Sequence, residues 1–411
     1  MRRRVVVTGA GAISPVATSA AGLHEALCEG RSGLKPIELF ETDGITGLGP
    51  RLAGEIRPFE PREWLGDRNL RPVDRTARLL LAAAQQALDA AGWAPELRTG
   101  RQAGLVIGTM YCSVRTIAEF DRRAVQLGPS YASPLDFANS VINAAAGQAA
   151  IWHGLPGVNS TISAGEASGL LSLATAADLI RTGRAEALLA GGVEELCFES
   201  FIGHLRAGRL APAGTVGDTG RPVPFDARRD GAALGEGAAL VALEEAGMAD
   251  LRGATVLAEV LGHGSAFDPG GGTGRAEALA RAIRQALDDA GLGPADVDAV
   301  STGASGGVNE DRQEALGIAA ALGDHAAMMP VTAVKSMLGE ALGASGALQA
   351  VAALGTLADG ILPGVLNLSE MDEGLPLNGV LSASRPIRAR QVLITVCGSG
   401  GHCCALILGA A

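Results

Sequence analysis

The residue whose position says most about chemistry is Glu166, in the segment Asn-Ser-Thr-Ile-Ser-Ala-Gly-Glu-Ala-Ser-Gly at 159–169. The segment begins as an apolar strand, Gly165 permits a tight turn, and a helix is expected just after Glu166. A strand, a sharp turn and a helix form a nucleophile elbow, which lifts one side chain to the helix N-terminus. A carboxylate there could move protons, but it is a poor acyl acceptor because an acyl anhydride is labile.

The elements that must position this elbow alternate between apolar strands and Ala/Leu-rich helices. Strands are expected at 5–8, 105–108, 187–190 and 238–243, and helices at 77–91 and 170–181. The alternation restarts after about residue 250, with strands expected at 254–260, 297–302, 330–334, 391–396 and 404–408, and helices at 275–290 and from 343. This pattern predicts an α/β fold with parallel or mixed sheets covered by helices. The restart predicts a duplication, with an N-terminal half at 1–250 and a C-terminal half at 251–411.

The composition restricts the class of protein. Hydrophobic residues make up 47% of the 411 residues, charged residues 19% and aromatic residues 3%, which indicates a large aliphatic core and extensive buried surface. The net charge of −11 argues against nucleic acid and anionic membranes as partners. Charge-free stretches such as 341–358 contain Gly, Gln and Ser, so they indicate core elements and not membrane spans. The N-terminus lacks the apolar region of a signal peptide, so we expect a cytoplasmic location.

Two features resemble functional motifs without fulfilling them. Gly9 and Gly11 follow a strand like half of a dinucleotide fingerprint, but the third glycine is missing and a structural strand–turn–helix explains them. The cysteines have neither metal-site nor disulfide spacing, so we expect free thiols, mostly in the core. They are Cys28, Cys112, Cys197, Cys397, Cys403 and Cys404. The sequence therefore predicts no metal site and no cofactor.

Four blocks with fixed spacing extend over nearly the whole chain. They are Arg-Val-Val-Val-Thr-Gly-Ala-Gly-Ala-Ile-Ser-Pro at 4–15, the elbow followed by Ala-Gly-Gly-Val-Glu at 190–194, Arg-Pro-Val-Pro-Phe-Asp-Ala-Arg-Arg-Asp-Gly at 221–231, and Lys-Ser-Met-Leu-Gly at 335–339. Together they resemble the β-ketoacyl synthase family, and the third block is the most specific. The resemblance implies a thiolase-like fold, in which two duplicated α/β halves form five layers, αβαβα, with cap or interface insertions in the N-terminal half.

Members of that family extend acyl chains by decarboxylative condensation. A cysteine accepts the chain from an acyl carrier protein, and two histidines assist decarboxylation and stabilise the oxyanion. This chain departs from the family at each of these positions. Glu166 replaces the cysteine, and Thr302 and Glu340 replace the two histidines. Gln349 replaces a carboxylate, so Lys335 is the one polar residue of the set that is retained. The family's gate loop, which normally carries a phenylalanine, here consists of Gly398, Ser399, Gly400 and Gly401. The chain alone is therefore not expected to condense acyl units.

The resemblance also implies that Glu166, Glu340 and Lys335 share one former active-site pocket. We expect a Glu–Lys–Glu cluster that fills this pocket, because the lysine would offset the two buried carboxylates. Carboxylates that point away from Lys335 would contradict that expectation. Cys403 and Cys404 are not expected to replace the nucleophile, since they lie on a closing strand without an elbow.

Ketosynthase-like chains without the cysteine include the chain length factors, or ketosynthase β subunits, of type II polyketide synthases, which make aromatic or polyene products. The resemblance implies a heterodimer with an active ketosynthase, formed chiefly by the strand and helix after the elbow. Loop side chains of such a subunit close the end of the partner's acyl tunnel. The bulky candidates are Met110, Tyr111, Leu135 and Phe137, for which ordinary packing is an equal alternative.

The resemblance implies an acyl carrier protein as a further partner. Carrier proteins are acidic, so we expect one to dock mainly on the ketosynthase and not on a chain with a net charge of −11. Arg206 and Arg209 could contribute, although solvated surface positions explain them equally.

A second class of function remains open. Glu166 and Glu340 could serve as general acid and base in a stand-alone decarboxylase or hydrolase of acyl-carrier substrates. A third alternative is a thiolase-like scaffold without such chemistry.

Overall fold

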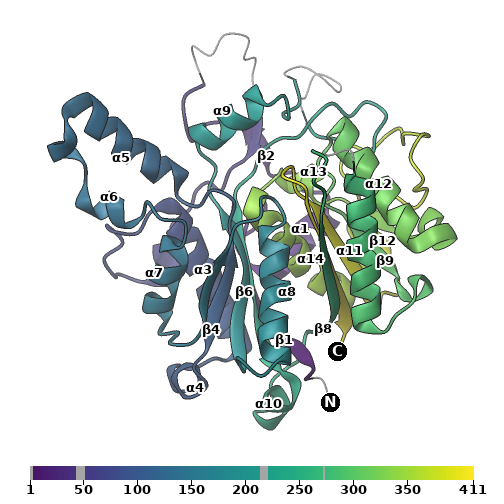
Figure 1. Cartoon of the computed structure of the whole chain (residues 1–411), viewed down its shortest axis with the longest axis horizontal. Coiled ribbons are helices and arrows are strands. Elements are labelled where there is room, and N and C mark those ends of the chain that lie inside the picture. The colour runs from purple at the N-terminus through teal and green to yellow at the C-terminus, as the bar shows by residue number, and fades with distance from the viewer. Residues whose placement is uncertain (1–2, 43–50, 213–220, 272–273) are drawn as a thin grey trace.

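The computed structural model describes residues 3–42, 51–212, 221–271 and 274–411. Ten strands form one ladder in the order β10-β9-β13-β14-β8-β1-β7-β6-β4-β5 (Figure 1). The first half contributes β1 (Val5–Ile13), β4 (Gly104–Gly108), β5 (Asn159–Ile162), β6 (Ala187–Glu194) and β7 (Gly237–Glu245). The second half contributes β8 (Ala258–Phe267), β9 (Ala299–Ser301), β10 (Val331–Thr332), β13 (Gln391–Cys397) and β14 (His402–Ala410).

The two halves repeat one strand topology. From β1 outward, β7 and β6 pair antiparallel, and then β4 and β5 pair parallel. From β8 outward, β14 and β13 pair antiparallel, and then β9 and β10 pair parallel. The two sets meet where Val6 pairs with Glu259 and Val7 pairs with Ala258. The predicted duplication of an α/β unit is thus confirmed, and the boundary at residue 250 stays a prediction.

Helices lie on the outer faces of both halves, and two helices lie between the halves. Helices α8 (Ser168–Arg181) and α14 (Ser345–Asp359) pack on each other and against strands of both halves. Helices α3 (Arg75–Ala91) and α7 (Ala144–His153) pack on the first half, whereas α11 (Arg275–Ala290) and α12 (Val308–Leu322) lie outside the second (Figure 1). The molecule therefore has the expected αβαβα layers of a thiolase-like fold.

The Gly-Ala-Gly segment has a packing role in both halves. A Cβ atom on Gly11 would lie 2.1 Å from the carbonyl oxygen of Ala83 in α3, and one on Gly264 of β8 would lie 2.2 Å from that of Ala282 in α11. Helix and strand can approach this closely only where the strand carries no side chain. The turn expected after residue 8 is wrong, because β1 continues through the glycines to Ile13. The strand expected at 254–260 instead begins at Ala258 and continues to Phe267.

The remaining elements are short and lie mainly at the ends of the layers. They are α1 (Ala20–Cys28), β2 (Leu34–Pro36), β3 (Leu52–Gly54), α2 (Arg62–Leu65), α4 (Pro95–Gly100), α9 (Phe198–Arg206), α10 (Ala246–Leu251), η2 (Pro294–Asp296), α13 (Lys335–Leu338), η4 (Leu342–Ala344), β11 (Ile361–Leu362) and β12 (Arg385–Pro386). The core around α8 and α14 consists mainly of Ala, Val and Leu, with no aromatic side chain among its buried residues, as the composition predicts. No helix of the described residues is long and apolar enough to cross a membrane.

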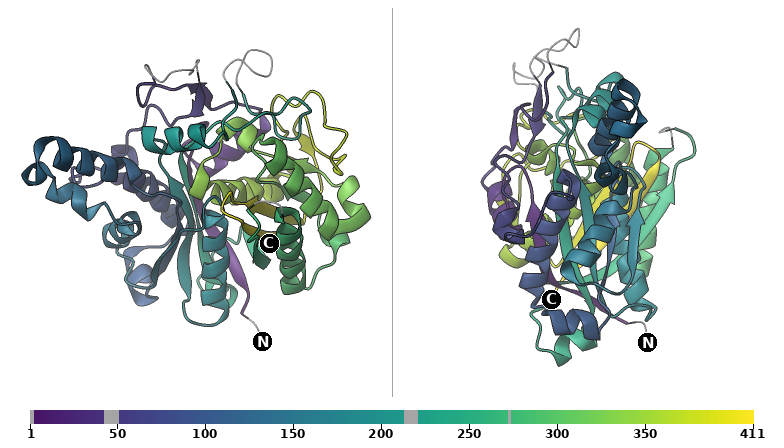
Figure 2. Two further views of the ribbon diagram at one scale, coloured as in Figure 1. Left: turned by 45° about the horizontal axis from the view of Figure 1, so that its top comes forward. Right: turned by 90° about the vertical axis from the view of Figure 1, so that its left-hand side faces the viewer.

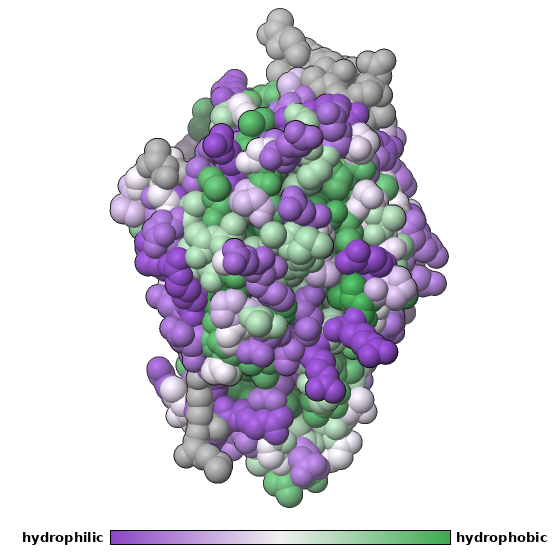
Figure 3. Space-filling model, turned by 90° about the vertical axis from the view of Figure 1, so that its right-hand side faces the viewer, coloured by the Kyte–Doolittle hydropathy of each residue, from purple (hydrophilic) through white to green (hydrophobic). Residues whose placement is uncertain are grey.

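One segment departs from this compact layering. Between β4 and β5, α5 (Val114–Leu127), η1 (Pro129–Tyr131) and α6 (Pro134–Ala138) project away from the sheets (Figures 1 and 2). We call residues 114–142 the arm. It carries exposed apolar side chains at Val125, Leu127, Tyr131, Leu135, Phe137, Val141 and Ile142. The face of the molecule on the side of α11 and α12 instead mixes hydrophilic and apolar residues (Figure 3).

Candidate active-site pocket

The strand, turn and helix expected around Glu166 are present. Strand β5 ends at Ile162 and α8 begins at Ser168, with Gly165 at φ +64° in the turn. The hydroxyl of Ser168 accepts from the amide of Ala164 at 2.9 Å and donates to the carbonyl of Gly165 at 2.6 Å, which fixes the turn. Glu166 is 7% exposed and lies in the wall of a cavity.

The carboxylate of Glu166 is held by the glycine-rich loop at 398–401. The amide of Ser399 donates to Oε2 at 2.9 Å, and its hydroxyl lies 3.2 Å from the same oxygen. Nη1 of Arg209 lies 3.9 Å from Oε1. Arg206 and Arg209 are both exposed, as the sequence predicts, and Arg209 also lines the pocket.

Lys335 pairs with Glu340. The ammonium donates to Glu340 Oε2 at 2.6 Å and to the carbonyl of Gly303 at 2.8 Å, and the other Glu340 oxygen accepts from Leu342 and Ser345. Burial would lower the pKa of Lys335, but the pairing with Glu340 raises it above the usual value. The Lys–Glu half of the expected cluster is formed, while the hydrogen bonds of Glu166 go to Ser399.

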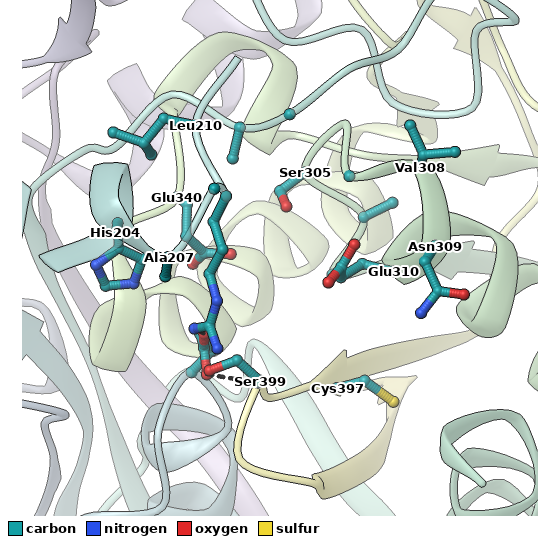
Figure 4. Close-up of a pocket in the computed structure, with 18 of the residues that line it drawn as sticks. His204, Ala207, Leu210, Ser305, Val308, Asn309, Glu310, Glu340, Cys397 and Ser399 are labelled. Carbon is teal, nitrogen blue, oxygen red and sulfur yellow. Dashed lines mark hydrogen bonds and ion pairs between the residues drawn. The ribbon is translucent and has the colours of Figure 1, made fainter. Parts of the chain in front are cut away.

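A cavity of about 370 Å³ remains between these groups. His204 of α9 and Ala207 just after that helix face it, as do Ser305, Asn309 at the start of α12, and Ser399 (Figure 4). Glu166 and Glu340 therefore line an open cavity. The expectation that they fill the former pocket is wrong, because each carboxylate binds hydrogen-bond donors in the cavity wall, Ser399 for Glu166 and Lys335 for Glu340.

Two of the substituted positions face the sheet. The hydroxyl of Thr302 donates to the carbonyl of Thr332 at 3.1 Å and so links β9 to β10. The amide of Gln349 donates to the carbonyls of Ser301 and Thr395, which joins β9 to β13. Neither residue is in the cavity lining, so neither side chain is placed for proton transfer there.

Two further cavity residues were not anticipated from the sequence. Glu314 of α12 is buried and accepts from the Thr395 hydroxyl at 2.6 Å and the Gly303 amide at 2.8 Å, and burial raises its pKa. Arg275, the first residue of α11, is also buried in the wall. The spacing of Asp311 and Glu314 places two acidic side chains on one helical face, which could have indicated buried carboxylates.

The thiols are unsuited to nucleophilic catalysis. Cys397 lines the cavity, and burial raises its pKa well above the usual value (Figure 4). Burial also raises the pKa of Cys404 on β14, and Cys403 is fully buried on the same strand. The thiolate is the reactive form, so the prediction that Cys403 and Cys404 do not replace the nucleophile agrees with their surroundings. Among the described residues, no group of three or more His, Cys, Asp or Glu could hold a metal ion.

The tunnel candidates lie in two separate places. Met110 and Tyr111 follow β4, where buried Glu194 accepts from their amides at 2.6 and 2.9 Å and from Gly343 at 3.1 Å. Burial raises the pKa of Glu194 to about 7. The Tyr111 ring meets that of His204 edge-on, 6.1 Å between centroids, at the cavity. Leu135 and Phe137 lie on α6 of the arm, where Phe137 is 63% exposed.

The sheet offers one open edge in the first half. Strand β5, before the elbow, is the last strand of the ladder and pairs only with β4 among the described strands. Strand β6, after the elbow, lies between β4 and β7 and is fully buried. The strand after the elbow therefore cannot form an interface, and the strand before it can.

Comparison with known proteins identifies the class. The model for the β-ketoacyl synthase N-terminal domain matches residues 2–249, and that for the C-terminal domain matches residues 257–369. The chain belongs to the β-ketoacyl synthase family.

Its relatives include both catalytic and β-subunit proteins. The tetracenomycin polyketide synthase ketoacyl synthase beta subunit of Streptomyces glaucescens is 34% identical over 410 residues, 98% of each chain. The 3-oxoacyl-[acyl-carrier-protein] synthase 2 of Coxiella burnetii is 32% identical over 410 residues, 99% of this chain and 98% of that one. The solved structure of the ishigamide ketosynthase/chain length factor superposes with a TM-score of 0.93 at 33% identity over 100% of both chains.

Proposed function

We propose that this chain is a non-condensing chain length factor, which pairs with an active ketosynthase and closes the end of its acyl tunnel in type II polyketide synthesis. The observation that carries the proposal is the elbow, where the Glu166 carboxylate occupies the nucleophile position and is bonded to the Ser399 amide. Glu340 is bound to Lys335 and Thr302 faces the sheet, so neither replaces a histidine. The scaffold is kept while the condensing groups are absent from it.

The surface of the first half supports a partner. An open sheet edge exposes backbone donors and acceptors, and proteins normally cover such an edge. The arm adds exposed apolar side chains, including Leu135 and Phe137, on the same half of the molecule. Apolar clusters of this kind mark protein interfaces. A second ketosynthase-like subunit fits this surface, since the family relatives include a polyketide synthase beta subunit.

The alternative, a stand-alone decarboxylase of malonyl-carrier substrates, has weaker support. The cavity wall carries Glu166, Asp230, Glu310, Glu314 and Glu340, against two arginines. A malonyl carboxylate would be repelled by such a wall. Glu340, which this alternative pairs with Glu166 for proton transfer, forms an ion pair with Lys335.

The test is co-expression with a ketosynthase that has the cysteine and both histidines. We expect a one-to-one complex that makes polyketide, and no condensation by this chain alone. Tyr111→Ala and Phe137→Ala should lengthen the product by at least one two-carbon unit, because each removes a ring from the proposed tunnel end. Met328→Ala, at a 79% exposed position in the second half, is the control. A homodimer that decarboxylates malonyl-carrier and loses this activity in Glu166→Gln would instead establish the alternative.

A further inference from the structure

The hairpin of β13 and β14 carries two cysteines directly opposite each other. Cys397 ends β13 and pairs in register with Cys403 of β14. The amide of Gly398 donates to the carbonyl of His402 at 2.7 Å, so the next position along the ladder is a hydrogen-bonded pair. Hydrogen-bonded and non-hydrogen-bonded pairs alternate in an antiparallel ladder, so the two cysteines form a non-hydrogen-bonded pair. The Cα atoms of such a pair lie about 4.5 Å apart, within the span of a disulfide.

The thiols of Cys397 and Cys403 lie on the same face of the sheet. Both side chains pack in the core beside α11, where the Cys403 thiol donates to the carbonyl of Arg275 at 3.7 Å. The Cys403 thiol contributes to the raised pKa of Cys397, so the two groups are close enough to interact. Cys404, the next residue, packs in the core around α8 and α14 on the opposite face. The structure thus places Cys403, and not Cys404, beside Cys397.

The two cysteines differ in access from the cavity. Cys397 is partly exposed and lines the cavity next to the loop with Ser399, whereas Cys403 is fully buried (Figure 4). A reagent that enters the cavity therefore meets Cys397 first. The wall carries more carboxylates than arginines, so it repels an anionic reagent. Hydrogen peroxide is small and uncharged, and such an oxidant suits this route.

We propose that Cys397 and Cys403 form a peroxide-modification site, in which oxidation joins them by a reversible disulfide across the hairpin. The Cys397 thiolate attacks one oxygen of the peroxide. The O–O bond breaks, an S–O bond forms, and the departing hydroxide takes up the proton of the thiol as water. The Cys403 sulfur then attacks the sulfenic sulfur, so that the S–S bond forms, the S–O bond breaks and a second water leaves with the Cys403 proton. Two electrons pass from the sulfurs to the peroxide.

The same surroundings make the reaction slow and give it a local consequence. Burial raises the pKa of Cys397, and the thiolate is the form that attacks, so the pair should stay reduced unless peroxide is abundant. The disulfide closes a ring around the loop at 398–402, which includes Ser399, whose amide holds Glu166. Oxidation would therefore restrict the loop that forms one wall of the cavity. The site needs no partner subunit, so it stands or falls separately from the chain-length role.

The test treats the folded full-length chain with hydrogen peroxide at millimolar concentration. Free thiols are then blocked with iodoacetamide, and tryptic peptides are analysed by mass spectrometry. The peptide that begins at Gln391 contains Cys397, Cys403 and Cys404. We expect this peptide to lose two hydrogens and to carry its alkyl group on Cys404, and dithiothreitol should reverse the loss.

Two variants of adjacent buried residues provide a matched comparison. Cys403→Ala should abolish the disulfide and leave a sulfenic acid on Cys397 that dimedone traps. Cys404→Ala, one residue further along β14 and on the other face, should form the disulfide as the wild type does. Loss of the disulfide in Cys404→Ala alone would overturn the assignment.

A second measurement needs no variant. The same treatment of the wild-type chain in urea should give a mixture of cysteine pairings, whereas the folded chain should give the pairing of Cys397 with Cys403. A pairing with Cys404 in the folded chain would contradict the proposal, as would oxidation of Cys397 to the sulfinic acid without a disulfide. Met328, which is 79% exposed, reports that peroxide has acted. An unchanged cysteine peptide after Met328 has become the sulfoxide would also overturn the proposal.

Discussion

The two halves share a strand topology but connect equivalent strands differently. In the first half the chain leaves β4 and returns to β5 through the arm and α7, with apolar side chains in solvent. In the second half the equivalent path from β9 to β10 consists of α12 and η3 (Gly323–Ala327), and α12 packs on α11 (Figure 1). The first half thus carries a projecting segment with exposed apolar side chains at a place where the second half packs a helix onto its neighbour.

The ends of β6 and β13, which hold equivalent places in the two halves, also differ in what they support. Strand β6 ends at Glu194, and Glu195 follows it. The buried carboxylate of Glu194 accepts from the amides of 110–111, and that of Glu195 accepts from the amide of Arg115 at the start of α5. Strand β13 is followed by the glycine-rich loop whose Ser399 holds Glu166. The strand end in the first half thus stabilises a surface segment, while the strand end in the second half holds a carboxylate in the cavity wall.

The largest effect is expected from the second-half ion pair beside the cavity. Lys335→Met leaves the Glu340 carboxylate buried without its cation, so the free energy of unfolding should fall by about 3–5 kcal/mol. Urea denaturation measures it. Arg4→Met, which breaks an exposed pair with Glu259, should cost less than about 1 kcal/mol. Equal losses in both variants would contradict the view that the pocket is a stabilised unit.

The arm should matter for association and not for folding. Phe137→Asp places a charge in the proposed interface, and we expect the Kd for the ketosynthase to rise by about 30-fold or more, as for an interface hot spot of about 2 kcal/mol. Met328→Asp, at an exposed position on the equivalent connection, should leave the Kd unchanged. If both variants bind equally well, the two connections do not differ in function.

A further prediction concerns the pH dependence of stability. Burial, with Asp74 and Glu236 nearby, raises the pKa of Glu195 from its usual value of 4.5 to about 8. The folded chain therefore holds a proton that the unfolded chain releases, so this group lowers stability as pH rises from about 4.5 to about 8. In Glu195→Gln the decline should be shallower, as measured by urea denaturation at pH 5.5, 7 and 8.5. Parallel curves for the two proteins would refute this assignment.

The sequence predicts the scaffold better than the contacts in the pocket. Alternating apolar runs and helices identify the layers, because these patterns depend on local spacing. The partners of Glu166 were missed because Ser399 and Arg209 are distant in sequence and join it only after folding. The expected cluster assumed that opposite charges in one pocket must pair, whereas a backbone amide meets the need of a carboxylate equally well.

The open edge of β5 also has a consequence for the supply of the protein in a cell. Without the proposed partner, the chain exposes unpaired strand backbone and an apolar arm, a combination that favours aggregation. Production in excess over the partner would then be wasteful, because surplus copies would be lost to aggregates and proteases. Matched synthesis of the two subunits, for example by translation from one message, is the arrangement that such an edge favours.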